Sequence, residues 1–355
     1  MNHVELFAGI GGFRQALTLL GHDFGVEQKT IAFSEIDESA VKTYKAAFDT
    51  LSELEMGDIV AFNQNKKNIF GLPDFDFLTG GFPCQSFSMM GKQKGFSDIR
   101  GNVFFQILEI LKIKKPKYIL LENVRNLKSH NGGKTFEFIL QSIRDCGYNY
   151  IYYDIFNSED FGLAQKRNRI FIFATTENLP NIQFSHRVIK DIFQNIRNKT
   201  SLSIQQTTHE ILEKKVDEKF YLSETIKPTI LSSGTKTYYS KSDINPLIAR
   251  PLTATMVKMH RACQDNYFSD GYIQSDDPVK YLETTYTKEE LCKQRIRKIT
   301  PQEAFMLQGF PFGFIEKAKK AGVSNAQLYK QAGNAVSINT VYAILYYLFV
   351  YLQLY

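Results

Sequence analysis

The feature that most constrains the fold is an alternation of short apolar segments with longer amphipathic segments through the first half of the chain. Strands are predicted at residues 2–7, 31–34, 75–79, 118–121, 150–156 and 170–174, with helices between them at 11–20, 39–48, 103–112 and 136–146. Strands that alternate with helices form a mostly parallel sheet with helices on both faces. Because ligands of such sheets bind at the carboxyl ends of the strands, functional residues are expected there.

Residues 177–296 break this pattern. They are polar and irregular, and they are predicted to form a separate, smaller and partly β region. Regular periodicity returns after this region. Since 355 residues are many for one average domain, we expect two domains. Residues 1–180 and 325–355 are assigned to the larger domain, and residues 181–324 to the smaller one.

Composition narrows the function only weakly. The chain is 43% hydrophobic and 23% charged, which is ordinary for a globular protein. Its net charge of +6 permits a polyanionic partner, but no single segment carries the excess, so the charge is weak support for nucleic-acid binding. The 4 cysteines include no C-x-x-C pair. No metal site or disulfide framework is therefore predicted, and a reducing cytoplasm is the expected setting.

The apolar run at residues 341–355 is shorter than the roughly 20 residues that a membrane span needs. We therefore expect a helix packed on the core, and no membrane partner. Residues 1–10 run directly into a structured motif, so no signal peptide is predicted.

The first motif is Phe7-Ala-Gly-Ile-Gly-Gly-Phe13, a glycine-rich turn between a strand and a helix. Glycines let the backbone approach a ligand, and the helix N-terminus offers free N–H groups. Without the full G-x-G-x-x-G pattern, the motif alone is weak support for a nucleotide-like cofactor, and an ordinary tight turn is the more common interpretation. Glu35 ends the next strand, where a carboxylate often binds ribose hydroxyls, although a surface acid is the simpler interpretation. Asp58 ends a third candidate strand at residues 57–59 and could bind an adenine amino group or cap a turn.

The second motif, residues 80–88, follows the strand at 75–79 and contains Pro83 and Cys84. Pro83 stiffens the loop. A cysteine at the carboxyl end of a strand can react as a thiolate if nearby charge lowers its pKa. For a loop cysteine taken alone, an inert role is more common.

Two further motifs follow later strands. In Leu120-Leu-Glu-Asn-Val124 a buried strand delivers Glu122 to the same edge of the sheet, and a buried carboxylate is costly unless it has a partner or a function. Gln165-Lys-Arg-Asn-Arg169 precedes the strand at 170–174. It is either a solvated basic turn or a cationic clamp beside the other loop ends.

Together these motifs closely resemble the bacterial C5-cytosine DNA methyltransferases of restriction–modification systems. The resemblance spans almost the whole chain and keeps the family's motif order at residues 7–13, 80–101, 122–124, 165–169, 297–311 and 331–336. The runs Gly81-Phe-Pro-Cys-Gln-Ser-Phe-Ser88 and Gln331-Ala-Gly-Asn-Ala-Val336 are highly specific. The resemblance implies an α/β fold: a Rossmann-like class I S-adenosylmethionine-dependent methyltransferase domain with a smaller, partly β target-recognition domain.

The resemblance also implies a cofactor site for S-adenosylmethionine, with S-adenosylhomocysteine as its product. Phe7 is expected to stack on the adenine, Glu35 to hold the ribose hydroxyls, Ile36 to cover the adenine face, and Asp58 to bind the adenine amino group. The other residues expected at the cofactor are Ala8, Gly9, Gly11, Gly12, Ile59, Pro83, Asn334 and Ala335.

By the same resemblance, Cys84 attacks C6 of cytosine and thereby activates C5. Glu122 contacts N3 and the exocyclic amine, and a protonated Glu122 would also act as a general acid. Arg167 is expected to contact O2 of the base, and Arg169 to order the active-site loop. Ser88 is expected to bind the phosphate beside a flipped-out nucleotide. Residues 86–102 are predicted to be a mobile loop that closes over DNA.

Residues 177–296 correspond to the family's variable target-recognition region. The segment 249–255 resembles its one recurrent element, although Pro251 stands before Leu252 where the family usually has Thr before an aliphatic residue. The residues predicted to bind DNA in this region are Arg250, Thr253, Lys258 and Arg261. For the basic residues, base reading and phosphate contact both remain open.

The expected partner is double-stranded DNA. A restriction endonuclease of the same system is a possible functional partner without a stable complex, and a monomer is expected. Three alternatives were weighed: a transfer-RNA cytosine methyltransferase, a catalytically silent DNA-binding regulator, and a dinucleotide dehydrogenase. The dehydrogenase leaves Cys84, Glu122 and Asn334 without a role.

Overall fold

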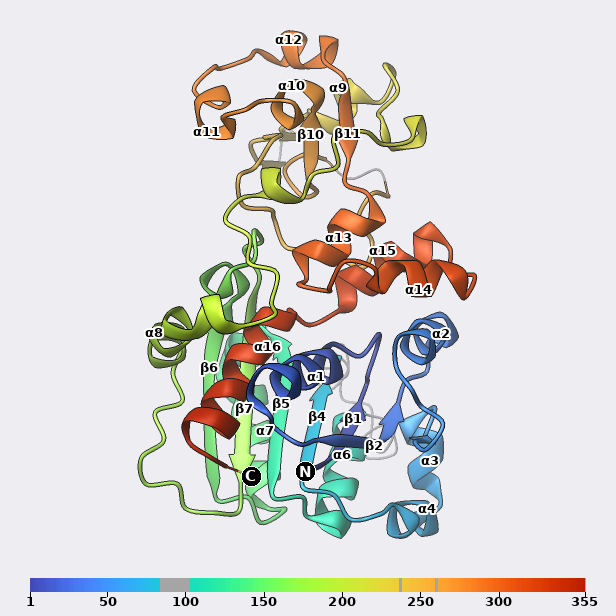
Figure 1. The fold of residues 1–355 in the computed structure, drawn as a ribbon, viewed down its shortest axis with the longest axis vertical. Coiled ribbons are helices and arrows are strands. Elements are labelled where there is room, and N and C mark those ends of the chain that lie inside the picture. Colours follow the sequence, from blue (N-terminus) through green and yellow to red (C-terminus); the bar gives the residue numbers. More distant parts are fainter. Residues whose placement is uncertain (84–102, 236–237, 259–260, 355) are drawn as a thin grey trace. The chain divides into compact units, whose positions relative to one another are not determined.

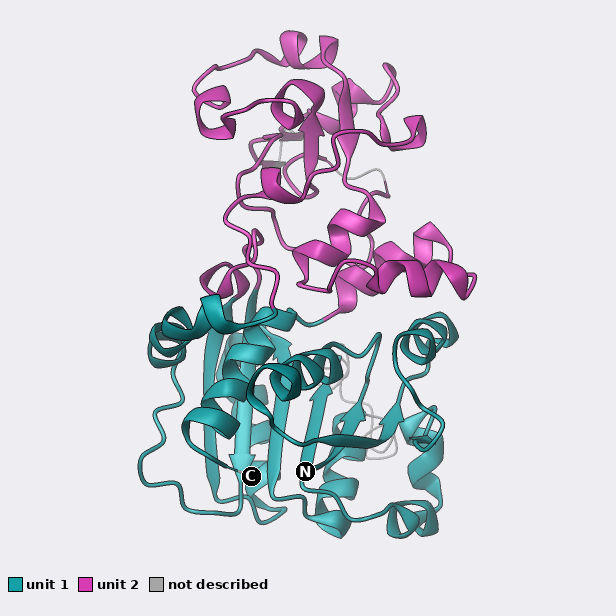
Figure 2. Ribbon diagram, in the orientation of Figure 1, with its two compact units in different colours: residues 1–157, 168–201, 336–355 teal, residues 158–167, 202–335 magenta. Residues whose placement is uncertain are grey.

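The protein is described by a computed structural model that covers residues 1–83, 103–235, 238–258 and 261–354. The chain forms two compact units (Figure 2). Unit 1 consists of Met1–Asn157, Asn168–Ser201 and Val336–Tyr355, and unit 2 consists of Ser158–Arg167 and Leu202–Ala335.

Unit 1 is built on a seven-stranded sheet in the order β3-β2-β1-β4-β5-β7-β6 (Figure 1). The strands are β1 Asn2–Leu6, β2 Lys29–Ser34, β3 Leu54–Glu55, β4 Phe77–Gly81, β5 Tyr118–Val124, β6 Tyr150–Asn157 and β7 Asn168–Thr175. The pairs from β3 through β5 are parallel, whereas β7 runs antiparallel to both β5 and β6. The predicted mostly parallel sheet is confirmed.

Helices cover both faces of this sheet. The helices of unit 1 are α1 Gly12–Phe24, α2 Glu38–Ala47, α3 Ile59–Gln64, α4 Lys66–Gly71, α6 Val103–Lys114, α7 Lys134–Arg144, α8 His186–Ile196 and α16 Ile338–Leu345, with the short turns η1 Arg125–Gly133, η3 Arg197–Lys199 and η6 Tyr346–Tyr351. On one face, Val4, Leu6, Leu78 and Leu121 share a core with residues of α3, α4, α6 and α7. Alternate strand residues point to the opposite face.

The opposite face is covered by the apolar segment near the C-terminus. The Phe349 ring packs against Phe77 of β4 and Tyr118 of β5. Among the described residues, one mostly helical segment, Asn325–Tyr351, is long and apolar enough to cross a membrane by length and composition, and 83% of its most apolar window is buried inside the protein. The expectation of a helix packed on the core is confirmed, because Leu345 and Leu348 are fully buried.

Unit 2 consists of short elements joined by long connections. Its helices are α9 Lys227–Ile230, α10 Asp270–Ile273, α11 Pro278–Tyr281, α12 Lys288–Lys293, α13 Pro301–Leu307, α14 Phe314–Lys320 and α15 Asn325–Asn334, with the 3-10 turns η2 Ser158–Phe161, η4 Thr208–Ile211 and η5 Glu218–Phe220. Its strands form two antiparallel pairs, β8 Gly234–Thr235 with β9 Tyr238–Tyr239, and β10 Tyr267–Ser269 with β11 Ile296–Lys298.

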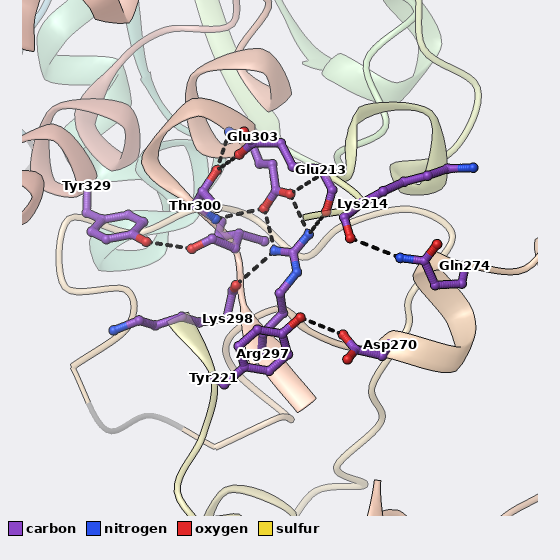
Figure 3. A network of polar contacts seen from close by, with 11 residues as sticks. Glu213, Lys214, Tyr221, Asp270, Gln274, Arg297, Lys298, Thr300, Glu303 and Tyr329 are labelled. Carbon is purple, nitrogen blue, oxygen red and sulfur yellow. Dashed lines mark hydrogen bonds and ion pairs between the residues drawn. The ribbon is translucent and has the colours of Figure 1, made fainter. Parts of the chain in front are cut away.

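A buried ion pair joins β11 to α13 in unit 2 (Figure 3). Arg297 donates to both carboxylate oxygens of Glu303, at 2.9 and 2.6 Å, and both side chains are fully buried. The same carboxylate accepts from the backbone N–H groups of Thr300 and Glu213. Such a bidentate pair offsets its desolvation only because its remaining lone pairs are satisfied.

The compact units differ from the expected domain boundaries. Helix α8 and the chain up to Ser201 belong to unit 1, whereas Ser158–Arg167 and the chain through Ala335 belong to unit 2. The predicted strand at residues 57–59 is wrong. Asp58 instead caps α3 by accepting from Val60 N–H at 2.9 Å, as acidic residues at a helix start commonly do.

Candidate active site

The turn between β1 and α1 is held open by its backbone conformation. Phe7, Gly9 and Gly11 all have positive φ angles, of 53°, 55° and 82°. A Cβ at Gly9 would meet no atom within 4 Å, whereas one at Gly12 would overlap Val336 Cγ2. Gly9 therefore borders open space, and Gly12 allows α1 to pack closely against the segment that leads into α16.

Glu35 fixes the carboxyl end of β2 to this turn. One carboxylate oxygen accepts from Gly9 N–H at 2.8 Å, and the other accepts from the N–H groups of Ile36 and Asp37 at 2.9 and 2.8 Å. Ile36 follows directly and is 73% exposed. An aliphatic side chain this exposed beside a glycine turn suits the apolar face of a ligand ring.

The remaining cofactor predictions fall in both units. In unit 1, Asp58 is exposed and Ile59 is buried in the core, and Pro83 is exposed at the end of the described segment. Ala8 is buried and donates its N–H to Ser34 O at 2.9 Å. Asn334 and Ala335 belong to unit 2, where Asn334 ends α15.

Glu122 and Arg169 form an ion pair at the end of β5. The Arg169 Nε lies 2.9 Å from Glu122 Oε1, and the side chains are only 19% and 11% exposed. Strand pairing explains this arrangement, since β7 runs antiparallel to β5 and sets Arg169 opposite Val124. Gly81 pairs with Glu122 on the other side, where a Cβ would lie 3.2 Å from Glu122 Oε2.

The chain that leads into the cysteine motif is tied to the same strand end. Asn123 Nδ2 donates to Phe82 O at 2.7 Å, and both side chains are buried. The predictions for Cys84 and Ser88, and for a mobile loop at 86–102, fall on residues outside those the structure describes.

Arg167 lies in a different environment from Arg169. Its side chain is 3% exposed. The guanidinium donates to Leu252 O at 2.8 Å, and to Gly333 O and Ala335 O at 3.0 Å each. A contact with O2 of a base would compete with these buried bonds. The geometry places Arg169 beside Glu122, and the contact between Arg167 and O2 of the base stays a prediction.

Two residues that the sequence analysis did not single out contribute to the same junction in unit 2. The fully buried Gln165 donates to Leu307 O and accepts from Leu252 N–H. A Cβ at Gly333 would overlap the backbone of Thr253 and Ala254. Two features of the sequence could have indicated these residues: the amide side chain at the first position of the 165–169 motif, and the glycine inside the 331–336 motif.

The residues predicted to bind DNA are partly exposed. Thr253 and Lys258 are exposed, and Arg261 is half-buried. Arg250 donates to Asp243 O at 3.3 Å, and its backbone is held by the side chain of Asn266. Among the described residues there is no group of three or more His, Cys, Asp or Glu that could hold a metal ion.

The fold and these motif residues define a Rossmann-like methyltransferase. A family model for C-5 cytosine-specific DNA methylases matches residues 1–349. The chain therefore belongs to this family, and it is a DNA (cytosine-5-)-methyltransferase.

Named relatives agree with this assignment. The chain is 35% identical over 351 residues to the Type II methyltransferase M1.ScrFI of Lactococcus lactis subsp. cremoris, covering 96% of this chain and 76% of the relative. It is 34% identical to the Type II methyltransferase M.HpaII of Haemophilus parainfluenzae, covering 96% and 87%. The crystal structure of S. pombe Dnmt2 methyltransferase matches with a TM-score of 0.71 at 20% identity, over 99% of each chain. The expected fold class is confirmed.

Proposed function

We propose that the protein methylates C5 of a cytosine flipped out of a specific duplex DNA sequence, with S-adenosylmethionine as donor and Cys84 as nucleophile. The observation that carries the proposal is the Glu122–Arg169 pair at the carboxyl end of β5, next to the strand that leads into the Cys84 motif. We propose that this methylation protects host DNA from a restriction endonuclease of the same system, and that the two enzymes form no stable complex.

The β1–α1 turn fits the cofactor. Gly9 borders open space, Ile36 offers an exposed apolar surface, and the carboxylates of Glu35 and Asp58 can accept from hydroxyl and amino groups. When bound, S-adenosylmethionine supplies an electrophilic methyl group on its sulfonium. In the proposal Asn334 and Ala335 contribute to the same site.

Cys84 makes C5 of the base reactive. The C5 atom of cytosine is a poor nucleophile, and addition of the Cys84 thiolate to C6 gives C5 the character of an enamine carbon. Once C5 carries the methyl group, it loses its proton, and the electrons of that bond expel the Cys84 thiolate from C6. The aromatic ring and the free cysteine are both restored.

Glu122 and Arg169 bind the polar edge of the base in this mechanism. Glu122 contacts N3 and the exocyclic amine, where charge develops during the addition of Cys84. Arg169 pairs with that carboxylate at 2.9 Å and orients it. Extrusion of the base costs a few kcal/mol, and Ser88, Arg250, Thr253, Lys258 and Arg261 are proposed to hold the surrounding DNA.

A covalent trap tests the proposal. Duplex DNA with 5-fluorocytosine at the target position blocks the final step, because C5 then carries no removable proton. We expect the native enzyme with S-adenosylmethionine to form a stable protein–DNA adduct on denaturing gels. Cys84→Ser should form none while it still binds S-adenosylhomocysteine in calorimetry.

Cys263→Ser serves as the matched control, because Cys263 is a free, partly exposed cysteine of unit 2. It should trap DNA as the native enzyme does. An adduct with Cys84→Ser, or its loss with Cys263→Ser alone, would remove Cys84 from its proposed role.

A further inference from the structure

Arg167 joins three segments that are far apart in the sequence, and it does so inside unit 2. We infer that Arg167 is a positioning residue that couples the segment 249–255, which contains two residues predicted to bind DNA, to the Glu122–Arg169 pair. The inference rests on the proposed function, because it assigns a task to a residue that does not itself touch the base.

Arg167 helps to hold the segment 249–255 in place. Its guanidinium reaches Leu252 O at 2.8 Å. Gln165 fixes the same residue from its other side, since the Gln165 carboxamide oxygen accepts from Leu252 N–H at 2.9 Å. The Lys166 N–H donates to Ala249 O at 2.9 Å, so successive residues of the 165–169 motif run alongside this segment.

The 331–336 motif also lies close to Arg167 and to the segment 249–255. Arg167 donates to Gly333 O and Ala335 O at 3.0 Å. The backbone of Gly333 lies so near Thr253 and Ala254 that a Cβ would overlap them. Buried carbonyls in such contact need donors, and one planar guanidinium supplies donors in several fixed directions at once.

The chain runs directly from Arg167 to Arg169, which pairs with Glu122. One residue, Asn168, separates Arg167 from Arg169, and β7 begins at Asn168. Arg169 is then fixed by its ladder position opposite Val124 and by its ion pair with Glu122. Two residues of extended chain span only about 7 Å, so a displacement of Arg167 is transmitted to Arg169 with little slack.

Lysine at position 167 is the informative substitution. Lys retains the charge but lacks the planar fork, so it cannot satisfy three carbonyls in the same geometry. A misplacement of about 1 Å in catalytic groups can cost about 100-fold in rate. For Arg167→Lys we expect kcat on duplex DNA to fall about 10- to 100-fold, with the KM for DNA and the affinity for S-adenosylhomocysteine changed less than about threefold.

Arg297→Lys provides the matched control. Arg297 is also a fully buried arginine of unit 2, but its bonds serve Glu303, Glu213 and Lys298. Both variants should lose thermal stability, and only Arg167→Lys should lose kcat when rates are compared per folded molecule. Equal losses of kcat in the two variants, or a loss that resides in the KM for DNA, would overturn the inference.

A second substitution covers the case in which Arg167→Lys does not fold. Gly333→Ala pushes the same segments apart without changing the Arg167 side chain itself. Gly271→Ala is its control, because the three atoms nearest to a Cβ there all belong to the Tyr281 side chain. We expect a selective loss of kcat in Gly333→Ala, and an unchanged kcat there would refute the coupling. Adduct formation by the native enzyme, measured separately, tells this failure from a failure of the proposed chemistry.

Discussion

Two ionisable side chains, His3 and Glu5, lie fully buried on the central strand β1. The His3 ring lies between the hydroxyls of Thr30 and Thr79, at 3.0 and 2.8 Å. Burial lowers the pKa of His3 to about 3, and a further lowering comes from the Arg14 charge. Burial raises the pKa of Glu5 to about 8, against the opposing effects of Arg14 and of the Tyr44 hydroxyl. Both groups are therefore neutral near pH 7.

These pKa shifts give opposite pH dependences of stability. Because the pKa of Glu5 is raised in the folded protein, the stability that Glu5 contributes is fully present below pH 4.5 and is lost as the pH rises through about 8. The lowered pKa of His3 means that its contribution is present above pH 6.5 and is lost as the pH falls toward 3. Between pH 7 and pH 8, Glu5 is the group of this pair that changes stability.

Glu5→Gln should remove that change. We expect the free energy of unfolding of the native protein to fall, relative to the variant, by up to about 1.4 kcal/mol from pH 7 to pH 8. Urea unfolding at both pH values measures the difference. Glu55→Gln, at an exposed carboxylate of unit 1, should show no such change. Parallel pH dependences of native protein and Glu5→Gln would contradict a buried, protonated Glu5.

At the scale of elements, the strand–turn–helix at residues 2–24 meets the segment that opens α16. The contact depends on the absence of a side chain at Gly12, which faces Val336 Cγ2. Gly12 opens α1, where Ala has the better helix propensity. Any loss of stability in Gly12→Ala must therefore come from overpacking rather than from the helix.

A double-mutant cycle tests this contact. Gly12→Ala should lower the free energy of unfolding by about 1–3 kcal/mol. Val336→Ala makes room for the added methyl group, so the double variant should cost less than the sum of the single variants, with a coupling of about 1 kcal/mol or more. Denaturant unfolding of the four proteins measures the cycle. Additive costs would show that the two residues do not press on each other.

Elements with a strong periodic signal were predictable. The apolar runs at β1, β4 and β5 and the glycine that opens α1 sit where the sequence analysis expected them, to within a few residues. Helix α8 was not predicted, because its Ile189, Phe193 and Ile196 repeat at helical spacing inside a polar stretch. Residues 57–59 were predicted as a strand, because a short segment with one apolar residue carries no period that distinguishes a strand from a capped helix start.

The candidate site was predictable in its residue types and less so in their geometry. Glu122 and both arginines are identified by motif alone, but the motif does not say which arginine meets the carboxylate. That choice depends on the antiparallel pairing of β7 with β5, a long-range contact with no local signature. The buried partners of Arg167 are backbone carbonyls, which every residue has, so no sequence pattern marks them.

At the scale of the whole molecule, the chain passes between the two units four times, after Asn157, Arg167, Ser201 and Ala335. Bonds from Arg167 to Ala335 O tie two of these passages to each other within unit 2. Segments of the two units thus alternate along the chain, and each unit by itself lacks part of the motif set.

We propose duplex DNA, rather than transfer RNA, as the substrate. We expect methyl transfer to duplex DNA and none to total transfer RNA when both are offered to the purified protein with labelled S-adenosylmethionine. Sequencing of the methylated DNA after cytosine deamination should place every methyl group within one short recognition sequence. Incorporation confined to the transfer RNA would contradict the proposed substrate.

The packing of α16 and η6 on the sheet has a consequence for biosynthesis. A nascent chain that has left the ribosome only as far as residue 335 holds every residue of unit 2, but it lacks the cover over Phe77 and Tyr118. Unit 1, which contains β1, is therefore completed only after unit 2. Until residues 338–351 emerge, Phe77 and Tyr118 lack the Phe349 ring that packs on them, so a chain whose translation stalls before this point should be less stable than the full chain.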